Sequence, residues 1–265
     1  MKKFFEYVGL TVLCLFSYYY TSMLGEYVSD KDTIMVNLEE KDKTLNKNCT
    51  EGYINEYGVV LGISGLSINK QKSYENMRGL GYDESLIEYN YDECKINKEN
   101  NIDKYIIKGN HHKNSVSIII ELDSLKYINS FINISNEKNI ELNILVNDYI
   151  FNNNISLLNK YYNEEINLLY TGNNIRKFKE EFNKTFCVYK EKYDLLESCA
   201  ENEINTIKTS KIFYKDALLN IKNNLEKGDI IILKENMNNL NELSSIINYI
   251  LSKGMEIISI NDLLE

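Results

Sequence analysis

The second half of the chain alternates between short apolar runs and amphipathic stretches. Seven apolar runs have the length and the β-branched content of buried strands; they cover residues 115–121, 140–146, 165–171, 185–189, 204–209, 228–233 and 255–260. Segments with helical periodicity separate them, at residues 124–138, 154–162, 174–184, 191–201, 215–227 and 239–254. Strands that alternate with helices in this way are typical of a parallel sheet or a barrel. The pattern predicts an α/β domain over residues 111–265.

The first 25 residues are the most apolar part of the chain. Lys2 and Lys3 precede an apolar run whose one charged residue is Glu6. About twenty such residues suffice to cross a membrane, and the tyrosines at 18–20 suit its far interface. The lysines before the run predict that the N-terminus lies inside and the rest outside. A cleaved signal peptide is the alternative, although no small-x-small cleavage site is evident.

Two further segments separate this predicted anchor from the α/β domain. Residues 26–52 are polar and charged without a lasting apolar period, which predicts a stalk. The following residues predict a short strand and turn at 57–66, a helix at 69–81 that ends at a glycine, and a strand at 103–109. We therefore expect four parts: an anchor at 1–25, a stalk at 26–52, a small module at 53–110 and the α/β domain at 111–265.

Composition excludes one class of function and leaves the cysteines open. The net charge of −9 argues against nucleic-acid binding, because phosphate contacts need clustered Lys and Arg. Four cysteines follow the predicted anchor, and they allow three pairings among which the sequence does not choose: Cys49, Cys94, Cys187 and Cys199. Because no two of them have the C-x-x-C spacing of a zinc or redox site, we interpret them as free or partly buried thiols.

The C-terminal run "KGDIIILKENMNNLNELSSIINYILSKGMEIISINDLLE" resembles the closing segment of the NodB-like polysaccharide deacetylases. Residues 116–154 are similar to the first half of that family, in which a "TFDDG" strand, a helix and a second strand follow in this order. The resemblance covers about residue 105 to the C-terminus. It implies a deformed (β/α)7-type barrel, preceded by the small module that some membrane-anchored members carry.

The family's catalytic positions can be sought at the end of the first barrel strand. The family holds a divalent metal with two histidines and an aspartate, and a second aspartate acts as the base. In the segment "IELDS", Glu121 takes the place of the base, Leu122 that of the metal-binding aspartate and Asp123 that of a glycine. We expect Leu122 to face a cleft that has become more apolar.

The other catalytic positions are altered as well. Leu169 and Asn173 stand where the resemblance places the two histidines, and neither is a good zinc ligand. Lys234, followed by Glu235, replaces the late histidine that acts as the general acid, and Cys187 lies near the family's arginine. The resemblance therefore implies vestigial positions, with no metal, no cofactor and no deacetylase activity.

Three alternatives for chemistry remain in the sequence. His111 and His112, adjacent residues expected to point in opposite directions, are a relocated metal site or two solvated loop histidines. Glu121 and Asp123 lie two apart on one face of a strand, as an acid and base of a glycoside hydrolase could. In the third alternative, Lys234 and Glu235 pair with these two carboxylates and turn a metal site into a salt-bridged plug.

Taken together, these features predict a membrane-anchored, extracytoplasmic protein of the bacterial cell envelope. Its role is expected to be non-catalytic, as a glycan-binding or scaffolding protein that engages peptidoglycan, another envelope glycan or an envelope protein. The alternative is an active but divergent polysaccharide or peptidoglycan deacetylase, or another carbohydrate hydrolase. An open cleft lined with tyrosines favours glycan binding, and a cleft closed by Lys234 against Glu121 favours scaffolding.

Overall fold

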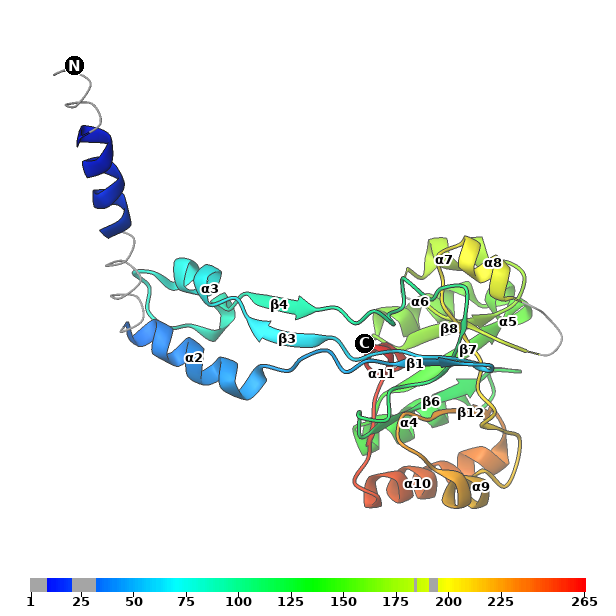
Figure 1. Cartoon of the computed structure of the whole chain (residues 1–265). Helices are drawn as coiled ribbons and strands as arrows, with labels where there is room; N and C mark the ends of the chain where they lie inside the picture. Colours follow the sequence, from blue (N-terminus) through cyan, green and yellow to red (C-terminus); the bar gives the residue numbers. More distant parts are fainter. Residues whose placement is uncertain (1–8, 21–31, 184, 191–194) are drawn as a thin grey trace. The chain divides into compact units, whose positions relative to one another are not determined.

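The protein is seen here in a computed structural model that describes residues 9–20, 32–183, 185–190 and 195–265. Two compact units emerge (Figure 1). The first comprises the described residues up to Asn48 together with Gly65–Asp92, and the second comprises Cys49–Ser64 and Glu93–Glu265. The predicted module at 53–110 is therefore divided, because its first and last strands join the large sheet of the second unit.

The first unit packs two helices on a two-stranded antiparallel sheet. Its elements are α2 (Thr33–Leu45), β3 (Gly65–Ile68), α3 (Lys70–Met77), the 3-10 helix η1 (Glu84–Leu86) and β4 (Tyr89–Asp92). Five side chains form its buried core: Ile34, Leu38, Ile68, Met77 and Ile87. The unit thus has an apolar core of its own.

Helix α2 contradicts the prediction of a stalk at residues 26–52. Ile34, Leu38 and Asp42 are buried on one face of the helix at a spacing of four residues. Asp42 interrupts the apolar pattern, but its carboxylate accepts a hydrogen bond from the Ile68 amide at 2.8 Å and pairs with Lys70 at 3.1 Å. Because the third buried position of the helix is the polar Asp42, the helical period of apolar residues was not recognised in the sequence.

The second unit is built on one curved sheet. Its strands lie in the order β1 (Tyr53–Asn55), β2 (Gly58–Val60), β5 (Tyr105–Lys108), β10 (Thr206–Ile207), β9 (Cys187–Val188), β8 (Asn167–Thr171), β7 (Leu142–Asn147), β6 (Ser115–Glu121), β12 (Ile230–Lys234) and β11 (Ile212–Phe213), and β13 (Glu256–Ile257) also pairs with β6. All neighbours from β2 onward pair in parallel. The seven predicted strands are confirmed, whereas β11 was not predicted.

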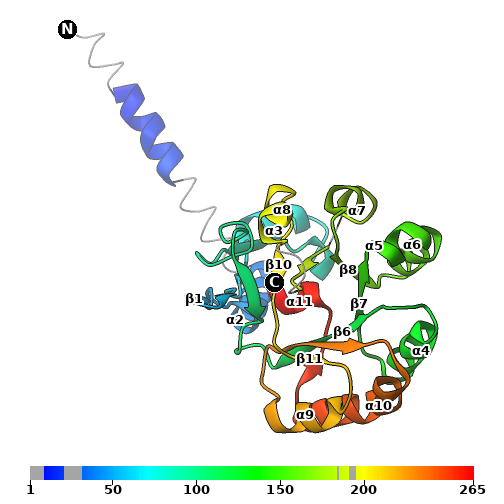
Figure 2. The ribbon, with the colours of Figure 1, turned by 90° about the vertical axis from the view of Figure 1, so that its right-hand side faces the viewer.

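Eight helices accompany the described part of this sheet: α4 (Ile128–Lys138), α5 (Asp148–Asn153), α6 (Ile155–Asn163), α7 (Ile175–Glu181), α8 (Leu196–Glu201), α9 (Ala217–Asn224), α10 (Met237–Ser252) and α11 (Ile260–Leu264). Helices α4 to α10 lie around the outside of the curved sheet, and α11 lies within it (Figure 2). Both faces of the central strands β6, β7, β8 and β12 are therefore buried, which explains their continuous apolar runs. On β6, Ile118 and Ile120 belong to the helix-side cluster, and Ile119 belongs to the inner cluster with Ile260 and Leu263 of α11.

A buried asparagine fixes α11 to the sheet. The Asn143 side chain, fully inaccessible to solvent, accepts a hydrogen bond from the Ile260 amide at 3.0 Å. The same side chain donates to the Ser117 hydroxyl at 2.8 Å and to the Ile118 carbonyl at 2.9 Å. These contacts involve the amino-terminal half of β6, so α11 leaves the carboxyl ends of the strands free to carry a site.

The two disulfides contradict the interpretation of the cysteines as free thiols. Cys49 is bonded to Cys94, and Cys187 is bonded to Cys199. The second bond joins β9 to α8, and both of its cysteines lie in the helix-side cluster. Of the three pairings that the sequence allowed, the structure has this one.

The predicted anchor at 1–25 lies partly outside the described residues. Residues 9–20 are helical, and their large apolar side chains are exposed. Within the described ranges, no helix has both the length and the apolar character needed to cross a membrane.

The first unit supplies a test of the packing of α2. Leu38→Ala should destabilise this unit by about 2–5 kcal/mol, because it leaves a cavity in a small core. Val36→Ala is the matched control, since Val36 lies on the same helix but is 42% exposed, and it should change stability by less than about 0.5 kcal/mol. Hydrogen exchange of the amides of β3 and β4 measures the effect. Equal protection in both variants would show that α2 does not pack on this unit.

Candidate functional site

The carboxyl ends of β6 and β12 meet in register. Along the parallel ladder, Ile120 pairs with Leu233 and Glu121 pairs with Lys234. The Glu235 amide then donates a hydrogen bond to the Glu121 carbonyl at 2.9 Å. The strand pairing thus brings together two segments that are more than a hundred residues apart in sequence, as the resemblance implied.

Four charged side chains at the carboxyl ends of these strands form a connected row of ion pairs. It is here called the Glu121 cluster and consists of Glu121, Asp123, Lys190 and Lys234. Lys234 Nζ lies 3.2 Å from Glu121 Oε1 and 2.5 Å from Asp123 Oδ1. Lys190 Nζ lies 2.6 Å from Glu121 Oε2. Side-chain exposure is 12% for Glu121 and 18% for each lysine, so these three charges are largely removed from water, whereas Asp123 is 55% exposed. Two ammonium groups balance two carboxylates.

The cluster keeps Lys234 protonated. Burial acts to lower the pKa of Lys234, but the hydrogen bond to Asp123 and the charge of Glu121 outweigh burial and raise it. The ammonium also lies 5.7 Å from the centre of the Tyr214 ring, where a cation–π interaction adds to its stabilisation. A general acid needs a pKa near the working pH, and the raised pKa of Lys234 lies far from that range.

Lys190 is the member of the cluster that the sequence did not single out. It follows β9 and precedes residues 191–194, which lie outside the described residues. The aligned segment "TFCVYKEKYD" drew attention to Cys187, which instead forms the disulfide with Cys199. A lysine directly after a buried apolar strand was the available signal, because its side chain lies at the same edge as the end of β6.

Glu235 does not join the cluster. Its side chain is 5% exposed and accepts hydrogen bonds from the Ser124 amide at 3.1 Å, the Ser124 hydroxyl at 2.9 Å and the Tyr127 amide at 2.6 Å. Tyr127 precedes α4 and provides no side-chain cap of its own. Glu235 therefore supplies the missing acceptor and a favourable negative charge at the start of α4. Of the predicted plug, Lys234 takes part and Glu235 does not.

Leu122 lies on the opposite side of the sheet from the Glu121 carboxylate. It is fully buried in the helix-side cluster, and its amide donates to the Leu145 carbonyl at 2.9 Å. Because successive side chains of a strand alternate between faces, the residue next to Glu121 turns toward the helices. The expectation that Leu122 faces a cleft is wrong.

Leu169 and Asn173 occupy different environments. Leu169 is fully buried in the inner apolar cluster, whereas Asn173 is exposed and its amide donates to Asp148 Oδ2 at 2.9 Å. Burial disfavours the Asp148 carboxylate, but hydrogen bonds from Tyr170, Asn173 and Asn174 outweigh it and hold its pKa below the usual range. Burial and the hydrogen bond to Asp148 raise the pKa of Tyr170. This polar group orders the loop after β8 and offers no metal site.

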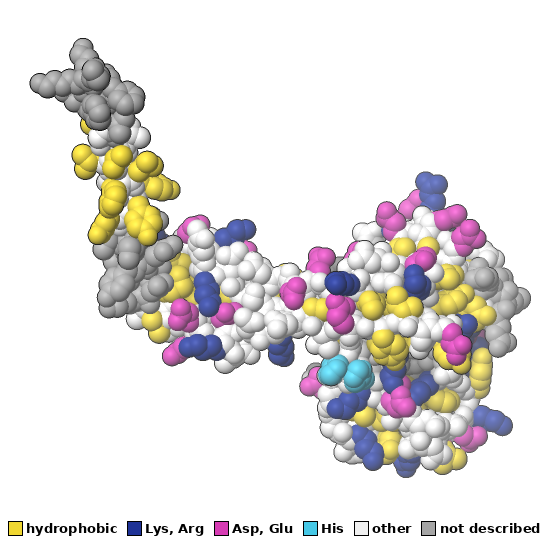
Figure 3. All heavy atoms as spheres, in the orientation of Figure 1, with side chains coloured by type: hydrophobic (Ala, Val, Ile, Leu, Met, Phe, Trp, Pro, Cys, Tyr) yellow, Lys and Arg dark blue, Asp and Glu magenta, His cyan; other side chains and the backbone are white. Residues whose placement is uncertain are grey.

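His111 and His112 lie in the turn between β5 and β6, at the amino end of β6. Both are exposed at the surface (Figure 3). Their ring centres are 4.2 Å apart, so the expectation that they point in opposite directions is wrong. Glu121 is the last residue of β6, at the opposite end of this seven-residue strand, which rises about 3.3 Å per residue. The structure therefore does not bring these histidines to the Glu121 cluster.

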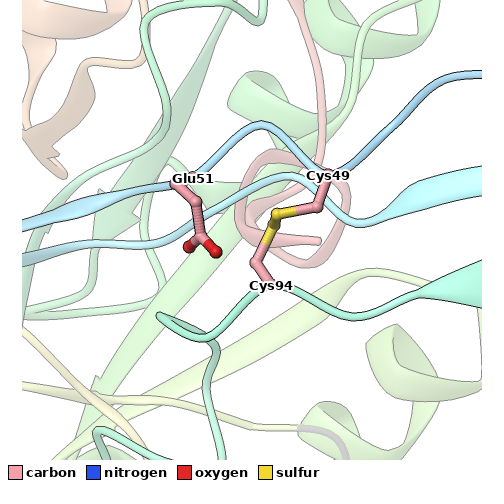
Figure 4. A group of neighbouring side chains, drawn as sticks. All are labelled: Cys49, Glu51 and Cys94. Atoms are coloured by element: carbon pink, nitrogen blue, oxygen red, sulfur yellow. A yellow bond between two sulfur atoms is a disulfide. The ribbon is translucent and has the colours of Figure 1, made fainter.

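One group of side chains has the proximity of a metal site but not its chemistry. Among the described residues, only Cys49, Glu51 and Cys94 place three candidate ligand atoms within 4.8 Å of one another. Figure 4 shows the two cysteines joined as a disulfide, which offers no thiolate. The Glu51 carboxylate accepts hydrogen bonds from the Lys95 and Ile96 amides at 3.2 and 3.5 Å. This group is structural.

The described residues at the carboxyl edge do not fit the metal of the deacetylases. Zinc needs three or more converging nitrogen, oxygen or sulfur ligands. The carboxylates of Glu121 and Asp123 already contact ammonium groups, Leu122 and Leu169 are buried among apolar side chains, and Asn173 is exposed on a loop. No catalytic step through a metal follows from this arrangement.

Comparison with solved structures decides the fold. No family model matches the sequence, and no curated protein matches it. BA3943 of Bacillus anthracis, a CE4 family pseudoenzyme, is similar with a TM-score of 0.63 at 13% identity, over 89% of this chain and 96% of that chain. A BA3943 mutant with restored enzymatic activity has a TM-score of 0.64 at 13% identity, over 88% of this chain and 98% of that one. The fold is that of the family 4 carbohydrate esterases.

Two further structures, described as a deacetylase and as a family 4 carbohydrate esterase, match a smaller share of the chain. The peptidoglycan N-acetylglucosamine deacetylase Bc1960 has a TM-score of 0.51 at 15% identity, over 60% of this chain and 92% of its own. PdaA of Bacillus subtilis, a family 4 carbohydrate esterase, has a TM-score of 0.51 at 13% identity, over 61% and 85%. The NodB-like resemblance is thus confirmed, and the family 4 esterase fold places the Glu121 cluster at the carboxyl edge of its sheet.

The Glu121 cluster supplies a second test. Lys234→Met should destabilise the protein by about 1–3 kcal/mol, because it removes one of the two ammonium groups that contact the largely buried Glu121 carboxylate and the one that pairs with Asp123. Lys160→Met is the matched control, since its pair with Glu164 is 3.8 Å long and the side chains are 63% and 50% exposed; it should cost less than about 1 kcal/mol. Urea denaturation at neutral pH measures both.

The pH dependence of the same difference is a further readout. Because the folded state raises the Lys234 pKa above 10.5, its contribution is fully present below that value. The contribution is lost as the pH rises through the folded pKa. The wild type and Lys234→Met should therefore converge in stability at strongly alkaline pH. A constant difference would indicate lost packing rather than lost charge.

Proposed function

We propose that this chain is a non-catalytic protein with the family 4 esterase fold, which binds or scaffolds components of the bacterial cell envelope. The Glu121 cluster is the observation that carries the proposal. In the cluster, Lys190 and Lys234 contact the carboxylates that an active enzyme would need for a metal or a base. The two ammonium groups occupy the carboxylate oxygens that a metal or a reacting water would otherwise contact.

Two physical arguments support the absence of deacetylation. Attack on an unstrained acetamide needs an activated water and a polarised carbonyl, both of which a divalent metal supplies in this fold. The positions aligned with the metal ligands are an apolar side chain on each face of the sheet and an exposed asparagine, at Leu122, Leu169 and Asn173. Lys234, with its raised pKa, is a poor proton donor at neutral pH.

The comparisons support both halves of the proposal. BA3943 is described as a pseudoenzyme, and its similarity extends over most of both chains. A chain with this fold therefore need not be active. Bc1960 acts on peptidoglycan N-acetylglucosamine, and we infer from that relative that an envelope glycan, or a protein bound to one, is the partner here. The rival function is an active hydrolase that uses Glu121 and Asp123.

We also propose that an N-terminal anchor holds the protein on the outer face of the membrane. The support is the apolar run that follows Lys2 and Lys3, and the exposed apolar side chains of the helical residues 9–20. Lysines before the span and acidic residues after it favour export of the rest of the chain.

Activity measurements test the proposed loss of catalysis. The purified protein should bind no stoichiometric zinc, cobalt or nickel, because no set of three ligands converges at the carboxyl edge among the residues that the structure describes. It should also release no acetate from N-acetylglucosamine oligomers or acetylated peptidoglycan. Acetate release that a chelator abolishes, and that Glu121→Gln also abolishes, would establish the rival hydrolase.

Fractionation tests the anchor. The full-length chain should remain in the membrane fraction after an alkaline carbonate wash, whereas a variant without residues 1–25 should be released, since the span supplies the apolar contact with lipid. Protease added to cells with the wall removed should digest the exported part. A full-length chain that stays soluble, or that resists the protease, would contradict the proposal.

A further inference from the structure

A cavity of about 470 Å³ lies in the second unit, among residues that the Glu121 cluster does not use. Its lining includes Tyr57, Ile107, Lys108 and the segment Lys208 to Lys211. Its volume is within the range of small-molecule sites. The cavity is therefore large enough to receive part of a ligand.

The strand order explains why the sheet is open at this place. Strand β10 pairs with β5, but β11, four residues later, pairs with β12. The Lys208 amide donates to the Ile106 carbonyl and the Ile232 amide donates to the Lys211 carbonyl, both at 2.9 Å. Residues 208–211 thus cross from one strand to another, and the crossing leaves a gap that their side chains line.

Three lysines surround this crossing, and two of them are neutralised. Asp229, only 3% exposed, pairs with Lys211 and lies 3.5 Å from Lys108 Nζ. Lys108 also pairs with Glu226, whose side chain is 70% exposed. Asp229 is itself held by the Glu226 amide, at 2.7 Å. A buried carboxylate therefore fixes two ammonium groups at the cavity wall, and an exposed carboxylate completes their balance.

The third lysine, Lys208, has no acidic partner among the residues that the structure describes. Its Nζ lies 4.8 Å from the centre of the Tyr105 ring and 4.6 Å from that of Tyr189. These rings, 5.2 Å apart, orient the ammonium group without neutralising its charge. In a chain with a net charge of −9, an ammonium group that lines a cavity and has no acidic partner among the described residues is suited to an anionic ligand.

An aromatic ring stands beside these charges. Tyr57 is 68% exposed and lies in the turn between β1 and β2. The Asn55 side chain accepts hydrogen bonds from the Tyr57 and Gly58 amides at 2.9 and 3.1 Å. A Cβ at Gly58 would lie 2.2 Å from the Tyr105 carbonyl oxygen, so only glycine allows the turn to approach β5 this closely. Tyr57 is thus held in place at the cavity, with its ring available for contact.

We propose that this cavity binds an acidic saccharide, with its carboxylate on Lys208 and a sugar ring against Tyr57. The proposal rests on the glycan-binding part of the proposed function and gives it a site and a ligand class. Lys108 and Lys211 add positive potential, and the hydroxyl groups of Thr209 and Ser210 are within the same lining. The Glu226 carboxylate, which contacts Lys108, is exposed enough to move aside for the ligand.

Calorimetric titration of the full chain with defined saccharides tests the proposal. The probe is a tetrasaccharide of alternating glucuronate and N-acetylglucosamine, compared with its carboxyl-reduced, neutral form and with inorganic phosphate. The wild type should bind the acidic form about tenfold or more tightly than the neutral form, the effect of one charge-assisted hydrogen bond. Equal binding of the two forms, or no binding of the acidic form, would overturn the proposal. So would equally tight binding of phosphate alone, which would indicate a simple anion site.

Variants locate the binding. Lys208→Gln should weaken binding of the acidic form to the level of the neutral form, and Tyr57→Ala should weaken binding of both forms. Lys253→Gln is the matched control, because Lys253 is also exposed, lies 5.3 Å from the Tyr249 ring and has no acidic partner among the described side chains. It should bind as the wild type does. Unchanged melting temperatures would establish that all three variants are folded.

The outcomes separate this proposal from the proposed function. Glycan binding that Lys208→Gln leaves unchanged would exclude the cavity but keep the glycan-binding role. Failure of the protein to bind any glycan, including whole peptidoglycan, would exclude both. Metal-dependent acetate release would exclude the non-catalytic role and leave the cavity to be judged by the titrations.

Discussion

The parallel pairing of β6 with β12 is the constraint on which the rest of the second unit depends. Strand β6 is buried on both faces and also pairs with β7 and β13, so its register decides which residues meet at the carboxyl edge. A shift by one residue would bury Glu121 among the apolar side chains next to α4 and α10, and place Leu122 beside Lys234. Burial of an unpaired carboxylate is costly. The charges of the Glu121 cluster therefore reinforce the register that the apolar residues prefer.

The same cluster shows how two neighbouring carboxylates can be held at this edge by the chain's own cations. Two carboxylates close together repel each other, and a largely buried one such as Glu121 needs a compensating cation. Lys190, which follows β9, and Lys234 at the end of β12 provide that compensation at 2.5–3.2 Å. Because both cations belong to the chain, the compensation does not depend on metal supply. It also restrains the carboxylates, which then have no free role as base or ligand.

The sequence predicted the central strands well because they are buried on both faces and read as continuous apolar runs. It failed where one polar residue has a buried role. Asp42 interrupts the apolar pattern of α2 in the sequence, although it is buried and accepts a hydrogen bond from the Ile68 amide. Glu235 was predicted to belong to the site, but it caps α4. Leu122 was predicted to face a cleft because an alignment gives the place of a residue along a strand but not the face on which its side chain lies. In the structure that face is the helix side. The contact of Lys190 with Glu121 could not be predicted from local sequence. Lys190 follows β9, and two strands, β8 and β7, lie between β9 and β6 in the sheet.

Charge balance separates the Glu121 cluster from the cavity at Lys208. Every charge in the cluster has a partner within 3.2 Å, so a ligand that binds there must first break an ion pair. Lys208 contacts two aromatic rings instead, and a ligand carboxylate would gain a charge-assisted hydrogen bond without breaking an ion pair of Lys208. An ion-paired cluster at one place and recognition at another are therefore compatible within a single sheet. By this reasoning, ligand binding is favoured where a lysine has no acidic partner among the described residues, rather than at the ion-paired Glu121 cluster.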